Sequence, residues 1–358
     1  MKKLFLTSIL LVSVLAALAG CGGGNSGRDP ARVIYVAGGY GNFGSFNEEQ
    51  ACYWTGQTRI MLGDEGRHSE AKALFVSGGN VYIAGDCYNS ASTAYTACYW
   101  LNSKENRVVL DSDEASKLSY AYSIYVSGGG IHVAGQDSDG HACFWLNDRD
   151  QKTVLDSTSS SEATAIFVVG SNVYVAGNAG SPKTPYYWQN NKDNKTPLTD
   201  GSYVRSIFVA GDGTVYAAGR YEQNSHSYAC YWINGVRHIL EDTEFSEAYS
   251  IRVHGGTIYV AGYHSPSGYS FGQACYWTVG TASPDEATMV PLDRGSSSSC
   301  SANAIFVCDN GDIYTAGHYR DSDEPKHACY WKNQNTTPVP LDTSAQSSWA
   351  TSIYVQPE

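Results

Sequence analysis

A short strand motif that ends in Ala-Gly recurs seven times along the chain, and it constrains the fold more than any other feature. Its copies are VIYVAG (33–38), VYIAG (81–85), IHVAG (131–135), VYVAG (173–177), VYAAG (215–219), IYVAG (258–262) and IYTAG (313–317). The motif glycines lie 42 to 55 residues apart. Internal repeats of this length predict an array of like supersecondary units that stack on one another.

Each unit contains the signals of four short strands. A variable loop follows the Ala-Gly strand and leads to a tryptophan, in six units within the sequence ACYW or ACFW. A polar turn, a leucine and a further strand such as SIYVSGGG (123–130) then lead to the next Ala-Gly motif. Glycine-rich hairpin turns predict antiparallel pairing, and no helical period appears after residue 32. The sequence therefore predicts an all-β fold, a seven-bladed β-propeller with four antiparallel strands per blade.

The two ends of the repeat region are complementary. Residues 33–62 contain three strands of the first unit, and residues 351–355 contain the missing one with nothing after it. We expect the C-terminal strand to complete the N-terminal blade, because pairing there removes both open sheet edges. Residues 33–358 then form the propeller.

The cysteine of ACYW shares one face of its strand with the large tryptophan, because side chains alternate along a strand. Neighbouring blades are about 10 Å apart, whereas a disulfide needs Cα atoms within about 7 Å. We therefore expect the cysteines of this repeated position to be buried, unpaired packing residues; they are Cys52, Cys98, Cys143, Cys230, Cys275 and Cys329. Cys300 and Cys308 lie on one strand, too far apart to bond each other.

The N-terminus predicts export and anchoring. Residues 1–20 have a basic start, an apolar run and small residues, as secretory signal peptides do. The run ends in Leu-Ala-Gly before Cys21, which resembles the lipobox of bacterial lipoproteins. The resemblance implies a lipid on Cys21, a tether over residues 21–32, and a cell-envelope location, with Gly22 permitting transport to the outer membrane. The membrane would then be contacted through the lipid.

The charge of the chain excludes one class of partner. Its formal net charge is −12, and removal of Lys2 and Lys3 with the signal peptide makes it −14. Because an acidic surface repels phosphates, we expect no nucleic acid as partner.

No catalytic or metal-binding constellation stands out, and we expect no cofactor. Metal-binding histidine spacing, nucleophile elbows and phosphate loops are missing from the sequence. The segment Asp137-Ser138-Asp139-Gly140 has only a slight similarity to a calcium loop, since further oxygen ligands do not follow. Enzymatic activity is left open by the sequence and is the less favoured interpretation.

Two columns of variable residues near the start of the repeated SIYV-like strand are the candidate ligand-binding positions. In a propeller these columns should surround the mouth of the central channel. We select from them Lys72, Tyr122, Arg205, Tyr249, Glu247 and Trp349. Long loops rich in Tyr, Ser, Asn and His on the same face also suit recognition.

The unit A-x-x-W, turn, Leu, then Ala-x-x-Ile, Gly, strand, Gly resembles the secreted HAF extracellular repeats and other bacterial seven-bladed propellers, such as those with YVTN repeats. The resemblance covers residues 33–358 and implies the fold; it brings no catalytic motif. The leading hypothesis is a lipid-anchored envelope protein that binds a glycan, peptide or protein partner without catalysis. The alternatives are a polysaccharide lyase or hydrolase and a structural subunit of an outer-membrane assembly.

Overall fold

The computed structural model describes residues 32–41, 49–64, 67–89, 94–111, 117–158, 160–242, 245–265, 272–292, 298–321, 324–344 and 346–356. Residues 1–31 lie outside this range, and with them the predicted signal peptide and the predicted lipid on Cys21. The described residues form strands without any helix. None of them therefore belongs to a helix that could cross a membrane.

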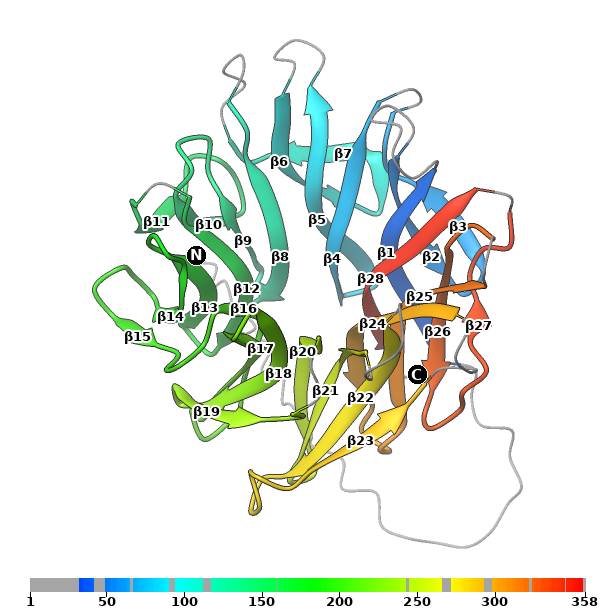
Figure 1. Ribbon diagram of the computed structural model, residues 1–358. Coiled ribbons are helices and arrows are strands. Elements are labelled where there is room, and N and C mark those ends of the chain that lie inside the picture. The colour runs from blue at the N-terminus through cyan, green and yellow to red at the C-terminus, as the bar shows by residue number, and fades with distance from the viewer. Residues whose placement is uncertain are drawn as a thin grey trace, which may run out of the picture. The chain divides into compact units, whose positions relative to one another are not determined.

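Seven sheets of four antiparallel strands form a ring (Figure 1), which confirms the predicted propeller. Blade 1 has the strand order β28-β1-β2-β3, and blades 2 to 7 follow along the chain. The innermost strands are β28 (Ser347–Gln356), β4 (Ser69–Ser77), β8 (Tyr120–Ser127), β12 (Glu162–Val169), β16 (Tyr203–Val209), β20 (Glu247–His254) and β24 (Ser298–Val307).

The other three strands of each blade lie progressively further from the ring axis. The second strands, which carry the Ala-Gly motif, are β1 (Val33–Gly41), β5 (Asn80–Asn89), β9 (Gly130–Gln136), β13 (Asn172–Ala179), β17 (Val215–Gln223), β21 (Thr257–His264) and β25 (Ile313–Asp321). The third strands, with the tryptophan, are β2 (Gln50–Thr55), β6 (Ala94–Leu101), β10 (Ala142–Leu146), β14 (Thr184–Gln189), β18 (His226–Ile233), β22 (Gln273–Gly280) and β26 (His327–Lys332). The outer strands are β3 (Thr58–Met61), β7 (Ser103–Val109), β11 (Lys152–Asp156), β15 (Lys195–Pro197), β19 (Val236–Ile239), β23 (Ala287–Pro291) and β27 (Val339–Pro340).

The two ends of the propeller region meet in blade 1, as the sequence predicts. Strand β28 pairs antiparallel with β1, and Tyr354 lies opposite Tyr35. Because the last strand supplies the inner edge of the first blade, the ring has no unpaired inner strand there.

A β-bulge interrupts the innermost strand of every blade, opposite the motif glycine. In blade 2 the bulge lies between Ala71 and Ala73, so that Lys72 has no cross-strand partner. A Cβ atom on Gly85 would collide with the carbonyl oxygen of Glu70, and the corresponding carbonyl blocks the motif glycine of every other blade. The Ala-Gly motif is thus a steric requirement of the bulge.

The core lies between the blades and is repeated with them. The seven tryptophans of the third strands are at most 1% exposed, and the leucine that ends each unit is buried beside them. Serine hydroxyls connect neighbouring blades: the Ser69 hydroxyl of blade 2 accepts a hydrogen bond of 2.9 Å from the Ala51 N–H of blade 1. Four further blade junctions repeat this bond, at Ser119, Ser161, Ser246 and Ser348.

The cysteines are packing residues, as expected. All nine cysteines of the described part are buried and free of disulfides. One contact was not expected: the Cys87 sulfur of β5 lies 3.5 Å from the Cys98 sulfur of β6. Burial raises the pKa of Cys143, Cys230 and Cys275, whereas the hydrogen bond from Cys98 lowers the pKa of Cys87.

The steric role of the motif glycine predicts that a single added methyl group at this position strongly reduces the stability of the fold. Replacement Gly262→Ala should lower the free energy of unfolding by about 1–3 kcal/mol, because its Cβ would collide with the Glu247 carbonyl of the bulge. Gly211→Ala is the matched control, since no atom lies within 4 Å of a Cβ there, and it should stay within about 0.5 kcal/mol. Urea denaturation of the three proteins measures this difference; equal losses would contradict the steric argument.

Thiol titration tests the state of the cysteines. The native chain should react slowly with a thiol reagent, because burial keeps these thiols protonated, and the unfolded chain should release nine thiols apart from Cys21. Cys87 should react first, so Cys87→Ala should remove the earliest phase. Fewer thiols in the unfolded chain would reveal a disulfide and contradict the packing assignment.

Candidate functional site

A central cavity of about 420 Å³ is enclosed by the innermost strands of all seven blades. Each blade contributes its bulge residue and the residues that follow it. A strand without a bulge would turn alternate residues away from the axis. The bulge adds one residue and so re-aims a side chain, which brings an extra variable position into the wall.

The bulge residues form the first of the two columns selected from the sequence, and all seven of them line the cavity. We call them the mouth residues: Lys72, Tyr122, Thr164, Arg205, Tyr249, Asn303 and Thr351. Three of them join blades, because their side chains donate to backbone carbonyls of the next blade: Thr164 to Val204, Asn303 to Ala350 and Thr351 to Ala71. The remaining four are the mouth residues that the sequence analysis selected.

Lys72 is held by two carboxylates and two rings. Its ammonium forms ion pairs with Asp86 and, at 3.4 Å, with Glu70, and it lies 4.8 Å from the ring centroids of Tyr120 and Tyr122. Burial alone would lower the pKa of Lys72, but the two carboxylates outweigh it and raise that pKa. Burial in turn raises the pKa of Asp86 to about 6. The lysine charge is therefore neutralised within the protein.

Arg205 has a similar arrangement across the ring. Its guanidinium lies 2.8 Å from Glu247, which also accepts a hydrogen bond of 2.8 Å from Arg220. The Arg205 guanidinium is also 4.4 Å from the ring centroid of Tyr203 and 5.6 Å from that of Tyr249. Its side chain keeps 36% exposure, so one face remains open to a ligand.

Tyr122 and Tyr249 are the neutral members of the mouth. Burial raises the pKa of both hydroxyls far above the ordinary range, so they remain protonated donors. Within the described part of the chain, neither hydroxyl takes part in a hydrogen bond. Two cations and two free hydroxyls thus border the entrance of the cavity.

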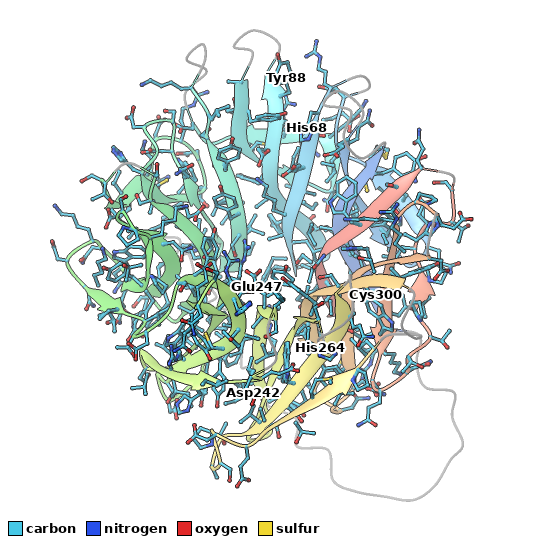
Figure 2. All side chains as sticks on the ribbon, in the orientation of Figure 1. His68, Tyr88, Asp242, Glu247, His264 and Cys300 are labelled. Carbon is cyan, nitrogen blue, oxygen red and sulfur yellow. The ribbon has the colours of Figure 1, made fainter. Side chains whose placement is uncertain are left out.

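Glu247 and Trp349 do not line the cavity, contrary to the expectation that both columns surround its mouth. They lie two residues before a bulge residue, where the strand still has its regular pleat, and their side chains turn toward neighbouring chain segments. Glu247 lies on β20 near the ring axis (Figure 2), 4% exposed and bound to blade 5. The Trp349 ring occupies the space that a side chain at Gly39 would need.

A further variable column, just after each motif glycine, was missed in the sequence. It faces the second column across the sheet: Asp86 pairs with Glu70, Arg220 with Tyr203 and His318 with Ser301. Asp86 of this column is a partner of Lys72, and Arg220 shares the Glu247 carboxylate with Arg205. The signal was available, because the residue after the invariant Ala-Gly changes in every repeat (Gly39, Asp86, Gln136, Asn178, Arg220, Tyr263 and His318).

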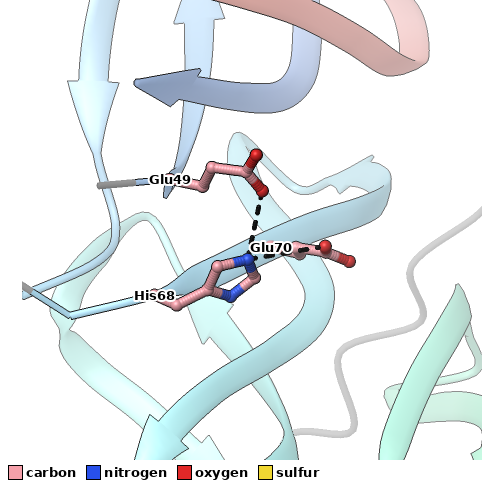
Figure 3. A group of neighbouring side chains, drawn as sticks. All are labelled: Glu49, His68 and Glu70. Carbon is pink, nitrogen blue, oxygen red and sulfur yellow. Dashed lines mark hydrogen bonds and ion pairs between the residues drawn. The ribbon is translucent and has the colours of Figure 1, made fainter. Parts of the chain in front are cut away.

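Glu49, His68 and Glu70 form a cluster between blades 1 and 2 (Figure 3), and their ligand atoms lie within 4.8 Å of one another. His68 Nε2 is 3.1 Å from Glu49 and 3.8 Å from Glu70. Glu70 also pairs with Lys72. His68 Nδ1 has no partner among the described residues, whereas a ligating histidine normally has one. These contacts favour an ion-pair network over a metal site.

The Asp137–Gly140 segment is explained without calcium. The Asp137 carboxylate accepts hydrogen bonds from the N–H groups of Asp139 and His141, and its other oxygen accepts one of 2.8 Å from Lys152. The 1% exposed carboxylate is thus satisfied by a tight turn and a lysine. These contacts give Asp137 a structural role in the turn, and the ligand atoms of Asp137, Asp139 and His141 lie within 4.8 Å of one another.

The composition of the cavity wall indicates what it can do. Its described lining residues include three cations, Lys72, Arg205 and Arg252, and neither a carboxylate nor an imidazole. Carboxylates and imidazoles are the usual groups of general acid–base catalysis at neutral pH. The raised pKa values of Tyr122 and Tyr249 keep these two hydroxyls protonated at that pH. The wall thus offers positive charge and hydrogen-bond donors, and its cations stand out in a chain of net charge −12.

Comparison with known proteins yields similarity in fold only. No protein-family model and no curated protein sequence matches the chain. A 6-phosphogluconolactonase candidate from Bacteroides fragilis has 11% identity and a TM-score of 0.48, covering 92% of this chain and 100% of its own. TolB from Acinetobacter baumannii has 11% identity and a TM-score of 0.47, covering 88% and 82%. The designed protein Ika8 has 15% identity and a TM-score of 0.42, covering 75% and 74%.

The half-buried His318 predicts a pH-dependent stability. Burial lowers its pKa to about 3 in the folded chain, against about 6.5 when unfolded. The contribution of His318 to the free energy of unfolding is fully present above pH 6.5. Between pH 6.5 and about 3 it falls by about 1.4 kcal/mol per pH unit, because only the unfolded chain takes up the proton there.

His318→Gln should remove this slope, and unfolding curves at several pH values measure it. Asp86 acts in the opposite direction, since its raised pKa favours the folded chain as pH falls below about 6. The difference between wild type and variant therefore isolates His318. Parallel pH profiles of the two proteins would contradict the assignment.

Proposed function

We propose that this chain is a lipid-anchored protein of the cell envelope that binds a glycan, peptide or protein partner at the mouth of its central cavity, without catalysis. The observation that carries the proposal is the set of four mouth residues whose side chains do not bond to the backbone of the next blade. Lys72 and Arg205 offer charge, and Tyr122 and Tyr249 offer free hydroxyls beside aromatic faces. Tyrosine and arginine are the residues that dominate recognition surfaces.

The absence of a base in the described cavity wall supports binding over turnover. The carboxylates near the mouth all form ion pairs with cations; they are Glu70, Asp86, Glu162 and Glu247. A lyase or hydrolase needs a base or acid that can reach the substrate. The enzyme alternative is therefore less well supported.

The anchoring part of the proposal rests on the sequence. The apolar run before Cys21 and the lipobox-like Leu-Ala-Gly support a lipid on that cysteine, and Gly22 supports an outer-membrane location. The acidic net charge of −12 supports a partner other than nucleic acid.

A scaffold role would require an apolar contact surface. The large apolar residues exposed in the described part are Val33, Leu118, Val236, Ile239 and Phe245. Val236 and Ile239 share the outer strand β19, and the others lie apart in the sequence. Single exposed apolar residues are normal on soluble proteins, so binding at the mouth is the better-supported function.

A binding screen tests the proposal. The full-length chain is presented to glycan arrays and envelope extracts beside a variant with Tyr122, Arg205 and Tyr249 replaced by alanine. We expect the variant to bind at least about tenfold more weakly, because it loses a charge and two aromatic contacts. A variant with alanine at the exposed Lys104, Glu105 and Asn106 of β7 is the matched control. Equal binding by all three proteins would place the site elsewhere.

A further inference from the structure

Aromatic side chains line the cavity at the position three residues after each mouth residue in six of the seven blades, and we call them the aromatic collar. It consists of Phe75, Tyr125, Phe167, Phe208, Phe306 and Tyr354. Adjacent rings are 4.7 to 5.8 Å apart from centroid to centroid, from Phe306 through Tyr354, Phe75, Tyr125 and Phe167 to Phe208. The seventh position, in blade 6, holds Arg252 instead. One cation thus interrupts an otherwise aromatic ring.

Arg252 is the cation of the cavity that has no acidic partner. Lys72 and Arg205 form ion pairs with carboxylates outside the wall, but Arg252 forms none within the described chain. Its guanidinium donates a hydrogen bond of 2.8 Å to the Ile251 carbonyl. Burial lowers the pKa of Arg252. The charge of Tyr125, which lies three blades away in the ring, acts in the opposite direction and raises that pKa. Arg252 is therefore part of the cavity wall, between the collar residues Phe208 and Phe306 of the two neighbouring blades.

Packing alone does not explain this residue. An unpaired charge in apolar surroundings is costly, whereas a phenylalanine or tyrosine would continue the collar at no such cost. Stacking on a ring could offset the cost, but no described ring lies within cation–π distance of the Arg252 guanidinium, in contrast to Arg205. A ligand that supplies the missing negative charge accounts for an arginine here.

We propose that Arg252 and the aromatic collar form a binding subsite for a small organic carboxylate with a flat apolar body. The guanidinium presents parallel N–H donors that match a carboxylate, and the Tyr125 hydroxyl can donate from the opposite side. The collar supplies faces on which a flat body can stack. A volume of about 420 Å³ is within the range of small-molecule pockets. The inference goes beyond the proposed function, because it assigns a small-molecule ligand to a deeper part of the same cavity.

Binding of 2-naphthoate to the full-length chain, measured by equilibrium dialysis, tests the subsite. We expect saturable binding that Arg252→Gln weakens by about tenfold to a hundredfold, because a hydrogen-bonded ion pair is lost. The neutral analogue 2-naphthamide should bind at least about tenfold more weakly than 2-naphthoate. Inorganic phosphate should not displace 2-naphthoate, since it has no apolar body.

Three outcomes would overturn the inference: no saturable binding of 2-naphthoate, equal binding by wild type and Arg252→Gln, or equal binding of the amide or phosphate. Arg252→Phe guards against a variant that merely misfolds. It should complete the collar and raise Tm by about 2 °C or more without ligand, yet gain no further Tm from 2-naphthoate.

The result is separable from that of the envelope screen. Alanine at Tyr122, Arg205 and Tyr249 leaves Arg252 and the collar in place. Loss of the envelope partner in that variant, together with no binding of 2-naphthoate to wild type, would overturn the subsite and leave the proposed function standing. Binding of 2-naphthoate to the wild type without any envelope partner would overturn the proposed function and leave the subsite standing.

Discussion

The close approach of a glycine to a bulged backbone is the contact on which the rest of the structure depends. At each motif glycine, the carbonyl two residues before the bulge residue occupies the space of a missing Cβ. The bulge turns an extra residue toward the axis, and the same bulge leaves the next residue in position to connect blades. Ser250, for example, follows the bulge residue Tyr249 and accepts a hydrogen bond of 3.2 Å from the Ile305 N–H of blade 7. Channel wall and blade contacts therefore have one local cause.

This arrangement separates the scaffold from the site. Tryptophan, cysteine, leucine and glycine recur because every blade must fill the same gap against its neighbour. The bulge residues meet no such demand, since they face a cavity and not another blade. Three of them still bond to the backbone of the next blade through Thr or Asn side chains, whereas the other four do not, although Arg205 pairs with the Glu247 side chain of blade 6. The diversity of those four residues on an otherwise repetitive scaffold is what a recognition site requires.

The repeats made the fold predictable, down to the pairing of the last strand with the first. They also placed Lys72, Tyr122, Arg205 and Tyr249 correctly around the channel. Glu247 and Trp349 were placed wrongly, because a bulge changes the facing of neighbouring positions and leaves no separate mark in the sequence beyond the glycine opposite. Asp86 and Arg220 were missed because they belong to a different strand from Lys72 and Arg205. Arg252 could have been noticed, since SIRV stands where the other repeats have SIYV, SIFV, AIFV or ALFV.

The distribution of charge along the channel determines how a ligand would be oriented in it. The cations at the mouth are neutralised by carboxylates behind the wall, so they hold the tyrosines in place and present hydrogen-bond donors with little net field. Arg252 lies deeper, between apolar rings, where a charge is less screened by water and acts more strongly on a ligand. A molecule with an anionic end and an apolar body is therefore drawn with its charge inward, past the hydroxyls of Tyr122 and Tyr249. The polar part of a larger partner would remain at the mouth, where the exposed face of Arg205 can contact it.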